Sequence, residues 1–213
     1  MKFRLLLLSI IPLLSGCAKY HADHLKRLKL KPVAEHKDIL FAAKTLTYSE
    51  CHQYLGRNVI AAGYIPIQLA ICNNSENCLE FSVDKINLKT TPANFVAESV
   101  RFSVLARLFG YGIPGLLILW PLVIPAIVDP IWAAESNGQM LRDYLDKSLH
   151  DKDINPGSIL EGLIFVAKNN YQNTLEVTLL GKNPKEKIVC SSDLIFEPIA
   201  EKLKAKALRR QRR

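Results

Sequence analysis

The residues with the most distinctive chemistry in this chain are its five cysteines. Cys17 ends an apolar run near the amino terminus, whereas Cys51, Cys72, Cys78 and Cys190 are spread through the rest of the 213 residues. A thiol can accept a lipid, form a disulfide or bind a metal, and its surroundings decide among these. The sequence contains no Cys-x-x-Cys spacing, so a zinc site is not favoured.

The surroundings of Cys17 indicate export. Lys2 and Arg4 precede an apolar run from Leu5 to Leu14, and the small residues Ser15 and Gly16 follow it. Ten apolar residues are too few to span a bilayer, so residues 1–16 are expected to be a signal peptide. The ending Leu14-Ser15-Gly16-Cys17 resembles the lipobox of bacterial lipoproteins. An ordinary cleaved signal peptide is the alternative.

The lipobox resemblance implies cleavage before Cys17, diacylation of its thiol and acylation of the new amino terminus, palmitate being one such chain. Ala18 after the cysteine, rather than aspartate, implies sorting to the outer membrane, on the side facing the periplasm. Three acyl chains would anchor the protein firmly, because even two lipid signals suffice for stable attachment. The first expected partner is therefore the membrane itself, through acylated Cys17.

The other four cysteines are an even number in an oxidising compartment, where disulfides are stable. Two strands at 64–72 and 79–90 are expected to form a hairpin around an asparagine-rich loop, which would bring Cys72 and Cys78 close together. The favoured pairing is therefore Cys72–Cys78 with Cys51–Cys190. Four free thiols are the alternative.

The longest apolar stretch runs from Leu108 to Val128 without a charged residue. A helix of this length would be about 31 Å long, enough to cross a bilayer. Pro114, Pro121 and Pro125 interrupt it, and the basic residues lie on its amino-terminal side, against the positive-inside rule for an exported protein.

Three interpretations of this stretch remain open: a non-spanning apolar hairpin bent near Trp120-Pro121, a transmembrane helix of a bitopic inner-membrane protein, and a buried core element. The hairpin is favoured, because a single crossing would separate the strands before the stretch from those after it. The residues expected to contact membrane or a partner protein are Leu116, Leu117, Ile118, Leu119, Trp120, Leu122, Val123 and Ile124.

Alternating apolar residues predict strands at 39–48, 64–72, 79–90, 159–168, 174–180 and 187–196. Helix-start signals at Thr91-Pro92 and Asp129-Pro130 predict two helices between them. The fold class is thus mainly β with a helical insertion (α+β). The runs 66–71 and 154–157 resemble those of uncharacterised envelope lipoproteins, which implies an immunoglobulin-like β-sandwich of about six or seven strands. Two helices and the apolar hairpin would be inserted between its halves.

The expected organisation has four parts: the signal peptide 1–16, a basic tether 17–37, a β-sandwich domain 38–198 with its insertion at 91–153, and a basic tail 199–213. The net charge is +8, and the tail is especially rich in the lysines and arginines that produce it. Clustered cations are attracted to anionic membrane surfaces. The tail residues expected to contact such a surface are Lys202, Lys204, Lys206, Arg209, Arg210, Arg212 and Arg213.

Motifs for catalysis are weak. The glycines of Gly110-Tyr111-Gly112-Ile113-Pro114-Gly115 match a dinucleotide loop formally, but no strand is expected before them. We therefore expect no enzyme, no cofactor, no metal and no nucleic acid partner. The predicted function is that of a structural or interaction lipoprotein of the cell envelope, with an envelope protein as a further partner. The alternative is a binding module for a lipid or another apolar ligand.

Overall fold

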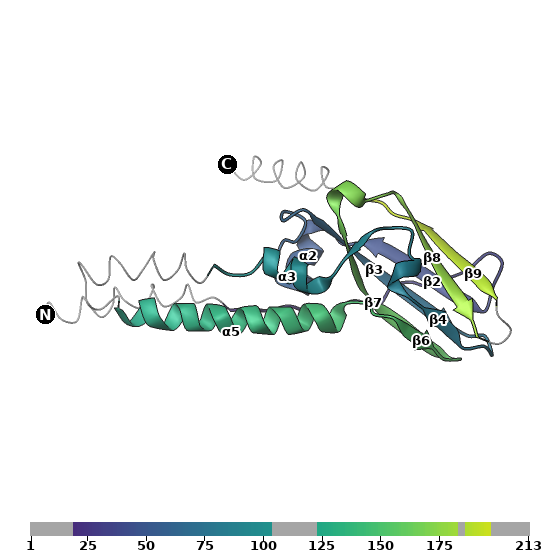
Figure 1. Ribbon diagram of the computed structural model, residues 1–213, viewed down its shortest axis with the longest axis horizontal. Helices are drawn as coiled ribbons and strands as arrows, with labels where there is room; N and C mark the ends of the chain where they lie inside the picture. The colour runs from purple at the N-terminus through teal and green to yellow at the C-terminus, as the bar shows by residue number, and fades with distance from the viewer. Residues whose placement is uncertain (1–18, 104–122, 183–185, 197–213) are drawn as a thin grey trace, which may run out of the picture. The chain divides into compact units, whose positions relative to one another are not determined.

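In the computed structural model, residues 19–103, 123–182 and 186–196 are described, and within 123–130 only the backbone is described. These residues form two antiparallel sheets and three helices, an α+β architecture (Figure 1). The strands are β1 Lys31–Pro32, β2 Ile39–Thr45, β3 Tyr64–Asn73, β4 Leu79–Phe81, β5 Thr90–Thr91, β6 Lys152–Ile154, β7 Ser158–Ala167, β8 Thr174–Gly181 and β9 Lys187–Asp193. The helices are α2 Tyr48–Leu55, α3 Ala93–Ser99 and α5 Val123–Lys147, with short 3₁₀ turns at Val83–Lys85 and Lys168–Asn170.

The chain divides into two compact units. Of the described residues, unit 1 holds 19–21, 101–103 and 123–143, and unit 2 holds 22–100, 144–182 and 186–196. Helix α5 therefore begins in unit 1 and ends in unit 2.

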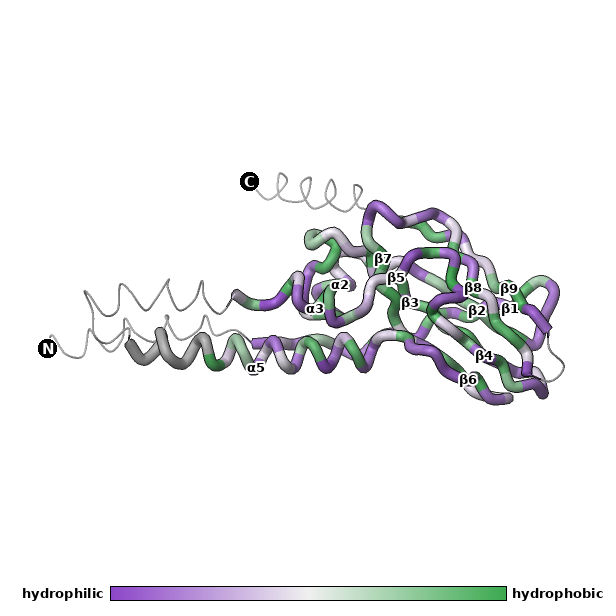
Figure 2. The backbone as a smooth tube through the Cα atoms, in the orientation of Figure 1, coloured by the Kyte–Doolittle hydropathy of each residue, from purple (hydrophilic) through white to green (hydrophobic). Residues whose placement is uncertain are grey.

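Unit 2 contains both sheets. One has the strand order β1-β2-β3-β7-β5 and the other β6-β4-β8-β9, and all pairs are antiparallel. Apolar side chains of both sheets share one buried cluster, which includes Ile67 of β3, Phe81 of β4 and Val177 of β8. Figure 2 shows hydrophobic residues recurring along these strands. Burial of this cluster is the main stabilisation of unit 2, because apolar burial contributes about 25 cal/mol per Å².

The prediction that the strands at 64–72 and 79–90 form a hairpin is wrong. Strand β3 pairs over ten residues with β7 and over seven with β2, so both of its edges are occupied. Strand β4 lies in the other sheet, between β6 and β8. The expected strand 79–90 is also interrupted: after Phe81 the chain forms a 3₁₀ turn and then the two-residue strand β5. The described strands number nine rather than six or seven, because β1, β5 and β6 have only two or three residues each.

Helix α2 is defined by local signals at both ends. Thr47 is its N-cap and forms a capping box with Glu50, in which each side chain accepts a hydrogen bond from the other residue's backbone N–H. Gly56 ends the helix in the left-handed conformation, with φ of 61°.

The carboxyl-terminal end of α5 is joined to α2. The Tyr144 hydroxyl donates to the Leu55 carbonyl at 3.0 Å, and the Lys147 ammonium donates to the Tyr54 carbonyl at 2.7 Å. These bonds satisfy carbonyl groups at the end of α2 that have no partner within that helix. The Tyr144 ring also stacks on Phe165 of β7, with 5.9 Å between centroids. The last turn of α5, which belongs to unit 2, is thereby fixed to the five-stranded sheet.

Residues 22–37, expected to be part of a basic tether, make several ordered contacts within unit 2. The Asp23 N–H donates to the Gln53 carbonyl, and the buried Gln68 side chain donates to the Lys26 carbonyl, both at 2.8 Å. Strand β1 then pairs with Leu40 and Phe41 of β2. Composition could not indicate this, because the contacts use main-chain groups that any residue carries.

Candidate membrane-contact site

The site is built on α5, which begins at Val123 and not at the expected start signal Asp129-Pro130. Asp129 and Pro130 lie inside the helix rather than at its start. Pro125 lies in the first turn, where a backbone N–H has no helical partner to lose, and only Pro130 removes an internal hydrogen bond. The last residues of the apolar stretch, from Val123 to Val128, are therefore helical and continuous with the amphipathic part that follows.

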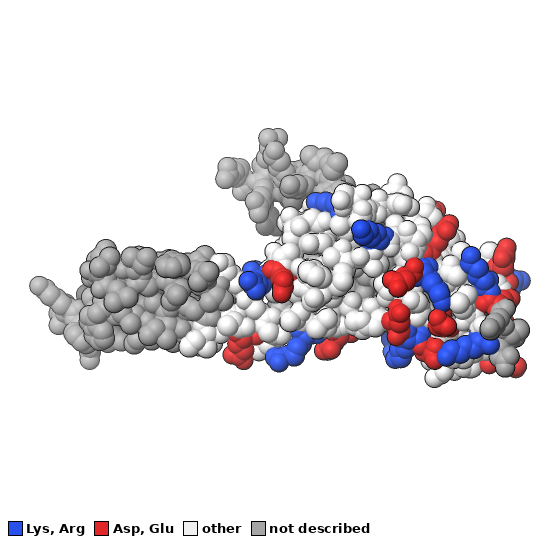
Figure 3. Space-filling model, in the orientation of Figure 1, with Lys and Arg blue, Asp and Glu red and all other residues white. Residues whose placement is uncertain are grey.

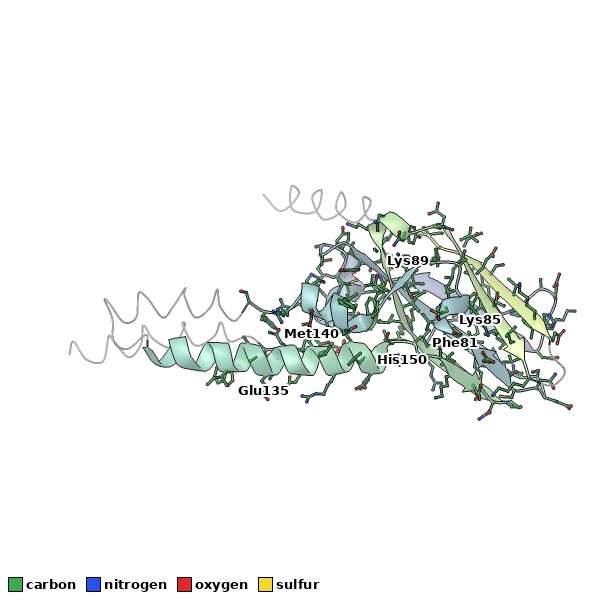
Figure 4. All side chains as sticks on the ribbon, viewed as in Figure 1. Phe81, Lys85, Lys89, Glu135, Met140 and His150 are labelled. Atoms are coloured by element: carbon green, nitrogen blue, oxygen red, sulfur yellow. The ribbon has the colours of Figure 1, made fainter. Side chains whose placement is uncertain are left out.

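The amphipathic part has two distinct faces. Ala133, Ser136, Met140 and Tyr144 are buried at intervals of three and four residues, the spacing of one helix face. Glu135 and Met140 lie on opposite sides of the helix in Figure 4. On the exposed side, Ile131 and Trp132 keep 60% and 40% of their surface accessible. The exposed apolar pair lies at the end of α5 nearest the apolar stretch.

Asn137 of α5 holds the segment that leads into the apolar stretch. The Phe102 N–H donates to Asn137 Oδ1 at 2.7 Å, and Asn137 Nδ2 donates to the Phe102 carbonyl at 3.0 Å. The amide therefore uses one donor and one acceptor on a single backbone residue. The residues on either side of the apolar stretch are therefore in contact, Phe102 before it and Asn137 after it.

Tyr20 ties the segment after Cys17 to the same part of α5. Its N–H donates to Ser136 Oγ at 3.3 Å, and its hydroxyl donates to Asp143 Oδ2 at 2.5 Å. Ser136 is adjacent to Asn137 in the chain. One short region of α5 thus holds both the segment following the expected lipid site and the segment entering the apolar stretch, all within unit 1.

Most residues predicted for membrane contact lie outside the described residues. Among these are Cys17, the six hairpin residues from Leu116 to Leu122, and the whole basic tail from Lys202 to Arg213. Val123 and Ile124 form the first two positions of α5. The sequence did not single out Phe102, Asn137 or Tyr20 for any contact in this site. A signal was available for Asn137, since an asparagine among the apolar positions of a helix commonly has a specific partner.

The four remaining cysteines are free thiols. Cys51 lies in α2 and Cys190 in β9, both fully buried, and burial raises the pKa of the Cys190 thiol to about 12. The Cys72 thiol donates to Asn74 Oδ1 at 3.2 Å, and the Cys78 thiol donates to Asn155 Oδ1 at 3.6 Å. Cys72 lies in β3 and Cys78 directly precedes β4, and these strands belong to different sheets. The hairpin argument for their pairing is therefore lost, and both disulfides stay predictions.

An open groove of about 640 Å³ lies in unit 2 between β2 and β9. Its lining includes Lys29, Lys31, Glu35, Ser191 and Asp193. Charged and hydroxyl groups do not favour an acyl chain, since burying them without partners costs free energy. This groove therefore gives no support to the alternative of a lipid-binding module.

Many charged side chains of unit 2 gather in one region of its surface. On the face seen in Figure 3, the acidic and basic side chains of unit 2 gather over the end where β4, β6 and β8 lie. Two ion pairs there are the partly buried Lys85–Glu80 pair at 2.9 Å and the exposed Lys182–Asp153 pair at 2.5 Å. Exposed pairs of this kind contribute only about 0–1 kcal/mol each, so they indicate a solvated surface.

The chain matches no family model, no curated protein and no solved structure. Among the helices of the described residues, none combines the length and the apolar character that a membrane crossing requires. In the same residues, no group of three or more histidine, cysteine, aspartate and glutamate side chains is arranged to hold a metal ion.

Proposed function

We propose that this protein is a lipid-anchored lipoprotein of the bacterial cell envelope with a structural or interaction role rather than an enzymatic one. Acyl chains on Cys17 would hold it in the outer membrane, facing the periplasm. The stretch 108–128 would enter the membrane as an apolar hairpin without crossing it. The two sheets of unit 2 would form an immunoglobulin-like sandwich, a fold that displays binding surfaces in many envelope proteins.

The observation that carries the hairpin is the pair of hydrogen bonds between Phe102 and Asn137. Phe102 precedes the apolar stretch by six residues, and Asn137 follows it by nine. Because these flanks are in contact, both ends of the stretch are on the same side of any bilayer that it enters. A single crossing would put them about 30 Å or more apart. The pair therefore favours the hairpin over the bitopic alternative.

The lengths also fit a hairpin. Helix α5 extends 14 residues from Asn137 back to Val123, which is about 21 Å at 1.5 Å per residue. The half-thickness of the hydrocarbon core is about 15 Å. This part of α5 is therefore long enough to reach into one leaflet while Asn137 stays outside the leaflet.

Alkaline phosphatase fusions would test the topology, because this enzyme is active only outside the cytoplasm. A fusion after Asp151 and a fusion after Ser99 are both expected to be active. An inactive fusion after Asp151 with an active one after Ser99 would overturn the hairpin and favour a crossing. Mass analysis of the amino-terminal peptide would test the anchor in parallel, and an unmodified Cys17 in the mature protein would overturn it.

A further inference from the structure

Ile131 and Trp132 form an exposed apolar pair on α5. They keep 60% and 40% of their surface accessible, although the helix buries Ala133 beside them completely. A tryptophan at the boundary between an apolar and a polar segment is typical of the membrane interface, where its ring lies at the level of the lipid headgroups.

The chain between Cys17 and Tyr20 limits how far the lipid can be from this pair. Three residues span at most about 11 Å. Tyr20 is held to Ser136 by its N–H, and Ser136 lies four residues, or about 6 Å, along α5 from Trp132. The Cys17 backbone can therefore reach the level of Trp132 if residues 17–19 run toward the amino-terminal end of α5.

The part of α5 beyond Trp132 has the length of a single leaflet. From Trp132 back to Val123 the helix extends nine residues, which is about 14 Å, against about 15 Å for half of the hydrocarbon core. The charged residue in this part of the sequence, Asp129, is only three residues, or about 4.5 Å along the helix axis, from Trp132. With Trp132 at headgroup level, Glu135 and the charged residues after it would lie on the aqueous side.

We propose that α5 enters the same membrane leaflet that holds the acyl chains of Cys17, with Trp132 at headgroup level and Ile131 just below it. This inference rests on the proposed function, since it requires a lipid on Cys17. It adds two contact residues outside the apolar stretch and names the partner as the anchoring leaflet, not an opposing membrane or a protein. Lipid and helix would then form a two-point attachment that sets the orientation of unit 1.

Tryptophan fluorescence in vesicles would test this proposal. The Trp120→Phe variant of the full lipidated chain leaves Trp132 as the only tryptophan. It would be added from outside to phosphatidylethanolamine–phosphatidylglycerol vesicles whose outer leaflet alone carries a nitroxide lipid labelled near the glycerol. Trp132 is expected to show blue-shifted emission and to lose most of its intensity to the nitroxide.

A matched control moves the probe along the same helix face. In the Trp120→Phe, Trp132→Phe background, Gln139→Trp puts an indole at an exposed position seven residues, or about 10 Å, toward the carboxyl end of α5. This indole is expected to keep a water-like emission and most of its intensity. Equal emission and equal quenching at the two positions would overturn the proposal, as would quenching of Trp132 only by a nitroxide in the inner leaflet.

The acylation state of Cys17 distinguishes failure of the leaflet contact from failure of the proposed lipoprotein function. An acylated chain whose Trp132 remains water-exposed would overturn the leaflet contact and leave the lipoprotein function standing. An unacylated Cys17 would overturn both.

Discussion

Asn137 and Phe102 exchange two hydrogen bonds, one in each direction, between a side-chain amide and one backbone residue. Because the partner is main chain, the contact does not depend on the identity of residue 102. It depends on the amide at 137, which holds the two flanks of the apolar stretch in contact.

Replacing Asn137 by alanine should release the segment at Phe102. The variant loses two hydrogen bonds of about 1 kcal/mol each, and faster chymotryptic cleavage after Phe102 is expected, measured by mass spectrometry of the vesicle-bound protein. Gln139→Ala is the control, since its side chain contacts only Glu135 on the exposed face. Identical cleavage rates in the two variants would show that the amide does not hold this segment.

Glycine-to-alanine changes at two positions should have opposite effects. A Cβ on Gly162 of β7 would lie 2.9 Å from the Leu149 side chain and 2.9 Å from the Lys147 carbonyl oxygen, where α5 ends against the strand. Gly162→Ala should therefore lower the free energy of unfolding by about 1–3 kcal/mol. Gly138→Ala meets nothing within 4 Å and should raise it by up to about 1 kcal/mol, because alanine favours the helix. Urea unfolding followed by circular dichroism would measure both, and a destabilised Gly138→Ala would show that α5 requires a glycine there.

The capping box of α2 should make stability depend on pH. Burial by itself would raise the pKa of the Glu50 carboxyl, but hydrogen bonds from Lys44 and Thr47 outweigh burial and hold that pKa below its usual value. A lowered folded-state pKa contributes stability above the unfolded pKa, and this contribution is lost as pH falls through the folded value.

The Glu50→Gln variant should accordingly be less stable than the natural chain at neutral pH. The difference should shrink as pH falls through the usual glutamate range to about 3, as measured by urea midpoints. Glu76→Gln, at an exposed loop position, is the control and should show no such trend. A difference that grew with falling pH would contradict the assignment.

The cysteines should differ in reactivity. Cys78 is only partly buried, whereas Cys51, Cys72 and Cys190 are buried. Thiolate is the reactive form, and the raised pKa of Cys190 keeps its thiol protonated at neutral pH. In the reduced, folded protein, iodoacetamide should modify Cys78 first and Cys190 last, and urea should remove the order. Rapid modification of Cys190 in the folded chain would show that β9 opens.

Trapping the protein directly from cells would test the disulfides. If Cys72–Cys78 and Cys51–Cys190 form in the envelope, all four cysteines should resist alkylation in urea until a reductant is added. Modification of all four cysteines without reductant would show that neither disulfide forms.

Several strands were predictable because their pattern is local. The apolar alternation around 174–180 corresponds to β8, and the run that begins at 187 corresponds to β9, with which β8 pairs. The end of α2 at Gly56 was likewise predictable, since a left-handed residue there favours glycine. The same local reasoning failed for the start of α5, because a proline costs a hydrogen bond only where the preceding turn is already helical.

The candidate site was only partly predictable. The apolar stretch and the lipobox are continuous in the chain and therefore visible in it. The contacts that organise them join the Tyr20 backbone to the Ser136 side chain and the Phe102 backbone to the Asn137 side chain, each across more than 30 residues. No residue pattern records such pairings.

The strands also show which features the sequence determines and which features only the tertiary structure decides. By itself the sequence determined which segments are apolar, where most strands and helices lie, and which chemistry the amino terminus resembles, because these depend on residue types and their spacing. Only the tertiary structure decided that β3 pairs with β2 and β7 instead of β4, and that Asn137 meets Phe102. Hydrogen bonding between main-chain groups is the same for nearly every residue, so packing and burial choose among the pairings.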